Sequence, residues 1–444
     1  MTILLAVAGI LIMVIAIAVS IALHEIGHLV PAKLFNVRVT QYMIGFGKTL
    51  WSTRKGETEY GVKAIPLGGY VSMIGMLPPN KPGEKVSKSR RRYFQTMAQQ
   101  AREDAAAELT AQDEGRTFIS LPVWKRIIIM LGGPFMNLII ALVITAILVT
   151  SFGVATPTTK VSDVFECMTE TTDAAALQAD CGADDEPSPA WEAGLRPGDT
   201  VTHFNNQEVS DWDELSGAIR KRANAQTNIT YVRDGESQSS TITPVLTERP
   251  QLDRFNQSVT DASGDVETTS VGFIGMSSQI ENVEQPVTAA FGVLGDQISG
   301  TFSVITVLPA KLWDTAKVLL TDGERDPTGP VSVVGVGRIA GEAAAQQDIP
   351  LADRGAMLLS LIAGLNVALM VFNLIPLLPL DGGHVLGGLW EWIRRGWAKL
   401  RGKPDPGPFD IAQMFPLTIV VFGLLLSMAV LLIIADLIKP VTLF

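Results

Sequence analysis

Four long apolar segments interrupt an otherwise mixed pattern of hydrophobic and polar positions. They cover residues 3–23, 127–153, 355–380 and 411–435, and none of them contains Asp, Glu, Lys or Arg. A helix needs about 20 apolar residues to cross a bilayer, and a charge at its centre costs about 2.5–3.5 kcal/mol. The pattern therefore predicts four transmembrane helices.

Two further apolar features need interpretation. Residues 297–310 are uncharged, but this run of 14 residues lies between Asp296 and Lys311. It is short for a span and predicts an interfacial or buried helix. The segment 3–23 has no basic residues before it and no small-residue cleavage site after it, so we expect a retained helix rather than a signal peptide.

Charge asymmetry predicts the orientation of the spans. Lys and Arg outnumber Asp and Glu in residues 31–125, five Lys and Arg crowd residues 394–403, and residues 153–355 carry an acidic excess. The positive-inside rule then places residues 31–125 and 379–411 in the cytoplasm. Both termini and the large acidic segment are expected outside.

The composition excludes several classes of protein. Of 444 residues, 47% are hydrophobic and 18% charged, and the net charge is −10. A long disordered chain is excluded, and an acidic chain is a poor partner for nucleic acid. Cys167 and Cys181 are too few for a Cys-rich zinc module. Both fall in the outside segment, where they form either one disulfide or two free thiols.

His24 and His28 stand four residues apart at the end of the first apolar segment. Residues i and i+4 share one face of a helix, so two imidazoles can reach one metal ion. Glu25 projects beside them, close enough to take a proton from water that the metal activates. His-Glu-x-x-His on a helix is the pattern of zinc hydrolases.

A catalytic zinc ion usually takes three protein ligands, so a third ligand is needed. Asp381 follows the third apolar segment. Because that segment and the first both enter from outside, Asp381 and His24 are expected at the same cytoplasmic membrane level. His384 is the alternative third ligand. Asn373, which precedes two helix-breaking prolines, is a candidate to bind substrate or an oxyanion.

The two metal motifs resemble those of the site-2 protease family of intramembrane zinc metalloproteases, and in particular its bacterial RseP type (regulator of sigma-E protease). The resemblance runs from the first apolar segment to the third. Further stretches resemble that family's re-entrant β-loop, its second-span signature and a motif that precedes its third span; they are residues 44–48, 65–71, 133–137 and 329–332.

The resemblance implies both a fold and a site. The fold is a polytopic α-helical membrane protein with four transmembrane helices, a membrane-associated β-loop and an extracytoplasmic α/β PDZ-like domain, in the bacterial cell membrane. The site holds one Zn²⁺ ion. Its ligands would be His24, His28 and Asp381, and Glu25 would be the general base.

Residues 39–72 contain β-branched and aromatic residues punctuated by glycine, a pattern that favours strands. Gly45 and Gly47 would let a second backbone approach closely, and a strand edge there can hold an extended substrate. An ordinary hairpin, and close helix packing at Asn137, are the alternatives. The candidate substrate-binding residues are Gly45, Phe46, Gly47, Asn137 and Asn373.

Residues 188–199 read Ser-Pro-Ala-Trp-Glu-Ala-Gly-Leu-Arg-Pro-Gly-Asp and precede a strand-like segment. Residues 209–219 then place apolar side chains at helical spacing. The order of turn, strand and amphipathic helix resembles a PDZ domain of the protease-associated type, whose groove captures an extended chain.

By the same resemblance, the substrates are single-span membrane proteins such as anti-sigma factors, already cut outside the membrane by an upstream protease. Membrane lipid is an expected partner and nucleic acid is not. Two functions of other classes remain: a membrane zinc transporter, and a PDZ scaffold with an inactive metal site. Residues 3–23 and 411–435 have few polar side chains to line an ion path, and an inactive site would not need Glu25.

The predicted division of the chain follows from these features. It is a first transmembrane helix with His-Glu-x-x-His (1–38), a re-entrant β-loop (39–79), a cytoplasmic polar helical segment (80–125), a second transmembrane helix (126–153), a PDZ-like domain (154–250), an extracytoplasmic strand and amphipathic-helix segment (251–354), a third transmembrane helix with Leu-Asp-Gly (355–384), a cytoplasmic loop (385–410) and a fourth transmembrane helix (411–438).

Overall fold

The computed structural model forms two compact units, Met1–Val149 with Pro286–Phe444, and Thr150–Gln285. We refer to them as the helical unit and the β unit. The residues that the structure describes are 2–77, 100, 102, 109–110, 113–168, 181, 185–250, 267–321, 323, 325–326 and 329–441. Most of the predicted polar segment 80–125 lies outside these residues.

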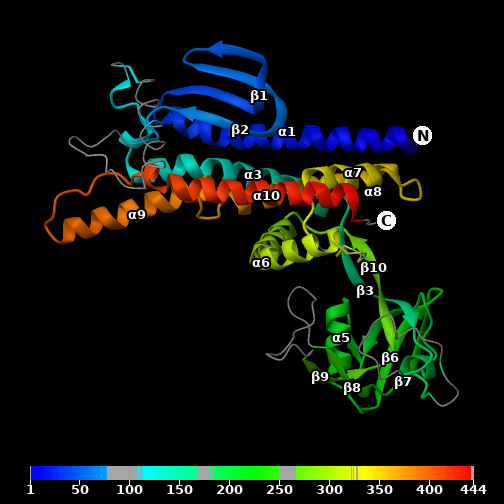
Figure 1. Cartoon of the computed structure of the whole chain (residues 1–444). Coiled ribbons are helices and arrows are strands. Elements are labelled where there is room, and N and C mark those ends of the chain that lie inside the picture. The colour runs from blue at the N-terminus through cyan, green and yellow to red at the C-terminus, as the bar shows by residue number, and fades with distance from the viewer. Residues whose placement is uncertain are drawn as a thin grey trace. The chain divides into compact units, whose positions relative to one another are not determined.

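Among the residues that the structure describes, five helices of the helical unit are long and apolar enough to cross a membrane. They are α1 (Thr2–Leu34), α3 (Val123–Ser151), α6 (Ala289–Leu319), α8 (Leu351–Asn373) and α10 (Phe415–Ile438) (Figure 1). The short 3-10 turn η4 (Ile411–Met414) leads into α10. The other described helical elements of this unit are η2 (Phe118–Ser120), α7 (Val333–Ala345) and α9 (Asp381–Leu400).

Helix α6 differs from the sequence-based expectation. The uncharged run 297–310 predicts a short helix, but α6 continues for 31 residues through Asp296, Lys311 and Asp314. The prediction of a short helix failed because a charge at the edge of an apolar run does not end a helix; only a change in backbone conformation does. By length and composition α6 is therefore a fifth candidate span.

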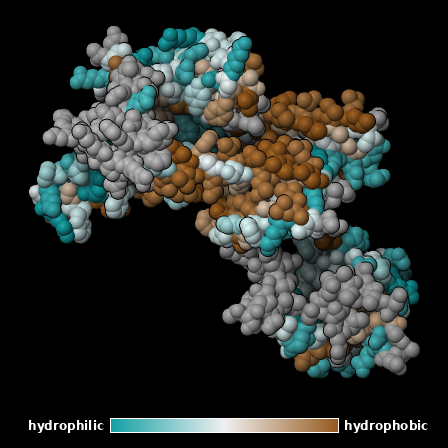
Figure 2. Space-filling model, viewed as in Figure 1, coloured by the Kyte–Doolittle hydropathy of each residue, from teal (hydrophilic) through white to brown (hydrophobic). Residues whose placement is uncertain are grey.

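The outer faces of these helices are apolar. Ile15 of α1, Val143 of α3 and Leu424 of α10 are each more than half exposed. Figure 2 shows hydrophobic side chains gathered over the helical unit. An apolar surface of this extent is stable when lipid rather than water surrounds it, so this unit belongs in a membrane.

Two glycines bring α1 and α3 into direct backbone contact. A Cβ built on Gly27 would lie 2.2 Å from the carbonyl oxygen of Gly132, and one on Gly132 would lie 1.9 Å from that of Gly27. Small residues of this kind let membrane helices approach closely. The contact lies between His24 and His28 on α1, so it brings α3 against both imidazoles.

The predicted third span ends earlier than its apolar run. Helix α8 ends at Asn373, and α9 begins at Asp381. A turn of seven residues joins them and contains Pro376 and Pro379, of which Pro379 follows a cis peptide bond. Proline removes a backbone donor and clashes with the preceding turn of a helix, so the helix cannot continue through these positions.

Strands β1 (Val39–Lys55) and β2 (Thr58–Met73) form a long antiparallel hairpin after α1. Its register shifts repeatedly, and Gln41 pairs with both Ser72 and Glu59. Gly45 and Gly47 have positive φ angles of 89° and 86°, a conformation that favours glycine. Both strands contact the end of α1 that carries His24 and His28, because Tyr42 of β1 hydrogen-bonds to Ala22 and Gly69 of β2 packs against Glu25.

The β unit contains an antiparallel sheet with strand order β10-β3-β4-β6-β7 and with β5 paired to β4. Strands β8 and β9 form a second, two-stranded sheet. The core of the unit gathers Val201, Phe204, Leu215 and Ile229, with α5 over the larger sheet. The bounds are β3 (Val154–Val164), α4 (Pro189–Glu192), β4 (Thr200–Phe204), β5 (Gln207–Glu208), α5 (Trp212–Arg220), β6 (Thr227–Arg233), β7 (Glu236–Ile242), β8 (Val245–Pro250), β9 (Thr268–Phe273) and β10 (Met276–Val283).

A disulfide joins Cys167 and Cys181 of the β unit. Of the two alternatives that the sequence leaves open, the structure therefore contains the disulfide and not two free thiols. The turn that the sequence singles out at residues 188–199 is formed by α4 and the loop after it. Asp199 is buried there and accepts hydrogen bonds from Arg233 and from the backbone N–H of Arg196. The PDZ-like identity of this unit remains a prediction.

Candidate active site

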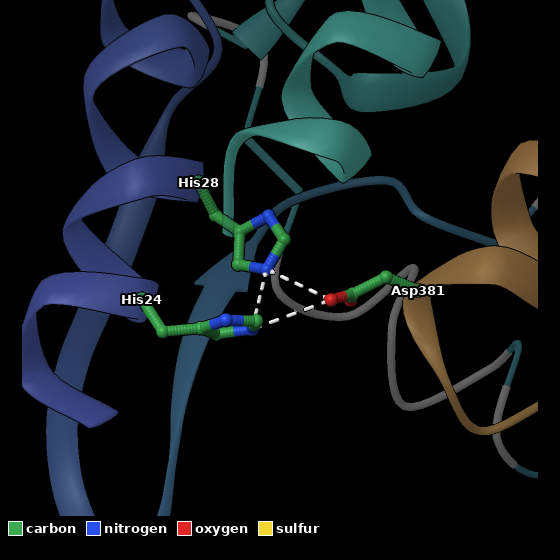
Figure 3. A group of neighbouring side chains, drawn as sticks. All are labelled: His24, His28 and Asp381. Carbon is green, nitrogen blue, oxygen red and sulfur yellow. Dashed lines mark hydrogen bonds and ion pairs between the residues drawn. The ribbon is translucent and has the colours of Figure 1, made fainter. Parts of the chain in front are cut away.

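Two side chains of α1 and one from the start of α9 meet beside α3. His24 Nε2 and His28 Nε2 lie 3.2 Å apart, and each lies 3.3 Å from Asp381 Oδ2. Figure 3 shows the two imidazoles projecting from one face of α1 and the carboxylate reaching them from the start of α9. The sequence spacing of four residues explains the first pair, because such residues are neighbours on a helix.

The hydrogen bond of His28 fixes which of its ring nitrogens faces Asp381. His28 Nδ1 lies 2.7 Å from the carbonyl oxygen of Ile129, and both groups are buried. A carbonyl oxygen only accepts, so Nδ1 carries the proton and donates it. Nε2 then presents a lone pair to the space shared with His24 and Asp381, which is the tautomer that binds metal.

Asn137 orients the ring of His24 in a similar way. Its side-chain amide lies 3.2 Å from His24 Nδ1, and Asn137 is fully buried. With the amide nitrogen turned toward the ring, Asn137 Oδ1 has no hydrogen-bond partner among the described residues. With the amide turned by 180°, Oδ1 accepts a hydrogen bond from His24 Nδ1–H. His24 Nε2 is then also free to bind metal.

The donor set fits a zinc ion. Two imidazole lone pairs and a carboxylate oxygen face one another within 4.8 Å, and Asp381 Oδ2 is buried with no hydrogen-bond donor in the described part of the chain. A cation between three acceptors gathered in this way would offset the cost of burying them together. Two His and one carboxylate, with one position left open, is a ligand set of catalytic zinc.

Glycine on α3 leaves room for such an ion. A Cβ built on Gly133 would lie 2.3 Å from His28 Nε2 and 2.6 Å from His24 Nε2. Any larger residue would therefore fill the space into which the two lone pairs point. The sequence marks Gly133 as part of a motif, but it gives no sign that the glycine faces the imidazoles.

A cavity of about 590 Å³ opens beside the three side chains. Glu25 lines this cavity, and only 9% of its surface is exposed. A Cβ on Gly69 of β2 would lie 2.9 Å from Glu25 Cγ, so the hairpin packs directly against this carboxylate. The wall is mostly apolar and comes from α1, β1, β2, α3, α7, α8, the α8–α9 turn and the start of α9.

Tyr42 fixes the hairpin to α1 close to Glu25. Its hydroxyl donates to the carbonyl oxygen of Ala22 at 2.8 Å. Burial, with a smaller effect from the neighbouring Glu25 carboxylate, raises the pKa of Tyr42 to about 12. The hydroxyl therefore keeps its proton, and the hydrogen bond persists, throughout the physiological pH range.

The predicted substrate-binding residues are placed differently from one another. Phe46 and Asn373 line the cavity. Gly45 and Gly47 lie on β1 outside the lining, where a Cβ on Gly45 would meet the carbonyl oxygen of Ile65 at 2.5 Å. Asn137 lies behind His24 and is not part of the cavity wall.

His384, the alternative metal ligand, also lines the cavity but lies outside the cluster of three facing ligand atoms. Its Nδ1 is buried and has no hydrogen-bond partner among the described residues. An unpaired nitrogen is less costly as a lone pair than as an N–H group, so the proton of the neutral ring belongs on Nε2.

The chain matches peptidase family M50 over residues 12–404. It belongs to this family. This M50 peptidase is 33% identical over 448 residues to zinc metalloprotease Rip1 of Mycobacterium tuberculosis, with 99% of each chain covered. It is 24% identical over 432 residues to the regulator of sigma-W protease RasP of Bacillus subtilis, with 86% of this chain and 87% of RasP covered.

These matches confirm several predictions from the sequence. The site-2 protease family is confirmed, and with it peptide-bond hydrolysis, regulated intramembrane proteolysis and the use of zinc. The M50 peptidase is a membrane protein that acts on membrane-protein substrates. Of the three functions weighed from the sequence, the matches support the protease and not the transporter or the scaffold.

Proposed function

We propose that this M50 peptidase cuts single-span membrane proteins inside the membrane, in the cavity that contains Glu25. One observation carries this proposal. A buried carboxylate, two imidazoles and Asp381 share a single cavity in an apolar helical unit. Groups as polar as these are costly at membrane depth unless they serve a common function.

We assign a role to each of these side chains. His24, His28 and Asp381 hold the zinc ion, and Ile129 and Asn137 orient the two imidazoles. Zinc bound there supplies Lewis-acid chemistry, which polarises a scissile carbonyl and makes water more acidic. Glu25 takes the proton of the attacking water and delivers it to the leaving amine. Proton transfer of this kind contributes about 10²–10⁴-fold to rate.

The substrate must be extended before its peptide bond can react, because a helix holds its carbonyls in hydrogen bonds. The β1–β2 hairpin supports this step, since an exposed strand can pair with an unwound chain. Phe46 and Asn373, which line the cavity, are the proposed contacts with substrate. Gly45 and Gly47 shape the strand that would accept it.

We propose four spans, α1, α3, α8 and α10. Both α1 and α8 end at the metal site, whereas α3 begins near it. The far ends of α3 and α8 therefore lie on one side of the membrane, and the chain between them, including α6, returns to the side from which it started. The start of α1 and the end of α10 point the same way (Figure 1), which supports an even number of crossings.

The positive-inside rule then orients the protein in a bacterial cell membrane. Both termini and the β unit, which we propose to be PDZ-like, lie outside, and the metal site lies toward the cytoplasm. The relative RasP is named as a regulator of sigma-W. We propose that substrates here are likewise anti-sigma factors or similar single-span proteins, cut first by an upstream protease.

The proposal is tested with the full chain in detergent and a purified single-span reporter. We expect cleavage within the reporter's transmembrane segment. This cleavage should stop when a zinc chelator is added and should return when zinc is restored. A reporter with a scrambled soluble linker in place of its span is the control and should stay intact. Undiminished cleavage in chelator would contradict the zinc-dependent mechanism.

A further inference from the structure

A buried ion pair joins α3 to α9 at some distance from the cavity. Arg126 Nη2 donates to Glu391 Oε1 at 2.5 Å, and Glu391 Oε2 accepts from the backbone N–H of Phe409 at 2.8 Å. Glu391 is fully buried and Arg126 is 7% exposed. Arg395, which is about one-third exposed, also contacts Glu391 Oε1 at 3.0 Å.

Around this pair the two helices are in close contact. A Cβ on Gly388 of α9 would lie 3.2 Å from Ile127 and 3.5 Å from Val123, both on α3. Burying two charges is costly, and their attraction rarely does more than offset the desolvation. A buried pair is therefore better explained by the orientation that it imposes on two elements than by net stability.

Helix α3 already orients two of the three metal-site residues. Ile129 accepts the hydrogen bond of His28, and Asn137 contacts His24. Asp381 is carried by α9 instead, as its first residue. Glu391 lies ten residues later, about 15 Å along the same rigid helix, and Arg126 lies one turn before Ile129 on α3.

We infer that Arg126 and Glu391 are positioning residues for the metal site. By fixing α9 on α3, they hold the Asp381 carboxylate opposite the imidazoles that α3 orients. The same helix then sets the position of all three ligands. This inference rests on the proposed role of His24, His28 and Asp381 as zinc ligands, and it adds two residues that touch neither metal nor substrate.

Glu391→Gln keeps the size of the side chain and the hydrogen bond from Phe409, but it leaves the Arg126 guanidinium without its buried carboxylate. Replacing a residue that is hydrogen-bonded to a metal ligand typically weakens metal binding about 10–100-fold, and loss of the α3–α9 ion pair is expected to reach the lower end of that range. We expect the zinc Kd to rise at least about tenfold in Glu391→Gln and in Arg126→Gln. The change should appear in metal-free protein titrated with zinc against a chromophoric chelator.

Asp436→Asn is a matched control. Asp436 is a buried carboxylate in the same helical unit, it pairs with Arg325, and it accepts a backbone N–H from Ser332 at 2.6 Å. This variant should lose thermal stability to a similar extent, and its zinc Kd should change less than about twofold. Arg395→Gln, which removes the partly exposed partner of Glu391, should also leave the zinc Kd unchanged.

Two glycine substitutions on α9 provide a second test, which can be used if the charge variants fail to fold. Gly388→Ala pushes α9 against Ile127, whereas a Cβ on Gly396 of the same helix meets no described atom within 4 Å. Both changes raise helix propensity equally. Gly388→Ala is expected to weaken zinc binding and Gly396→Ala is not.

The outcomes separate the two proposals. If wild-type protein binds no zinc, both the proposed function and this inference are wrong. If wild-type protein binds zinc, and Glu391→Gln and Asp436→Asn change the zinc Kd equally or not at all, the metal site stands and the positioning role of Glu391 is wrong.

Discussion

Replacing Glu25 by glutamine is expected to reduce cleavage of a single-span substrate about 10²–10⁴-fold while zinc remains bound. Glutamine has the shape of glutamate and can fill the same place against Gly69, but it cannot accept a proton from water. Glu25 is not one of the three residues whose ligand atoms face one another, which are His24, His28 and Asp381, so metal binding should be unaffected. The measurements are zinc content and single-turnover cleavage of a reporter by purified protein.

Glu57→Gln is the control for this prediction. Glu57 is an exposed carboxylate on the turn of the β1–β2 hairpin, where it pairs with Arg116. Its loss should leave both cleavage and zinc content near the wild-type values. Retention of full activity by Glu25→Gln would show that another group accepts the proton.

Replacing Gly133 by alanine is expected to remove zinc from the protein. The added methyl would lie within 2.6 Å of both His24 Nε2 and His28 Nε2, in the place that the metal would occupy. Alanine is the best helix former and suits α3 as well as glycine does, so the helix itself should be intact. The expected result is loss of bound zinc and of cleavage together, measured by elemental analysis and by the reporter assay.

Gly364→Ala provides the comparison for Gly133→Ala. Gly364 lies in the apolar helix α8, and a Cβ there meets no described atom within 4 Å. The same chemical change should therefore leave zinc content and cleavage unaltered. Wild-type zinc content in Gly133→Ala would mean that the metal is bound elsewhere.

Local spacing explains what the sequence could reveal about the site. His24 and His28 are four residues apart, so their meeting follows from helix geometry. Asp381 could be matched to them because two membrane spans of similar length reach one level. The signal was strong because His, Glu and Asp rarely border apolar segments without a functional reason.

Long-range contacts explain what the sequence did not reveal. Arg126 and Glu391 are 265 residues apart, and no local pattern links them. A charge within a membrane-bordering helix was the one available signal that each needs a partner. The motif makes Asn137 a candidate substrate-binding residue, but its position behind His24 depends on the glycine contact between α1 and α3, which no local pattern predicts.

Helix lengths were predicted less well than helix positions. Hydropathy marks where a chain can enter lipid, but it does not mark where the backbone stops being helical. Helix α8 therefore ends seven residues before its apolar run does, at a proline-containing turn, and α6 extends beyond its run through four charged residues.

The zinc content of Asp381→Asn, compared with that of His384→Asn, tests the central claim most directly. Both side chains line the same cavity, and the sequence alone left both open as the third ligand. We expect Asp381→Asn to lose its zinc and His384→Asn to retain about one ion per chain. Full zinc in Asp381→Asn together with its loss in His384→Asn would contradict the proposed metal site.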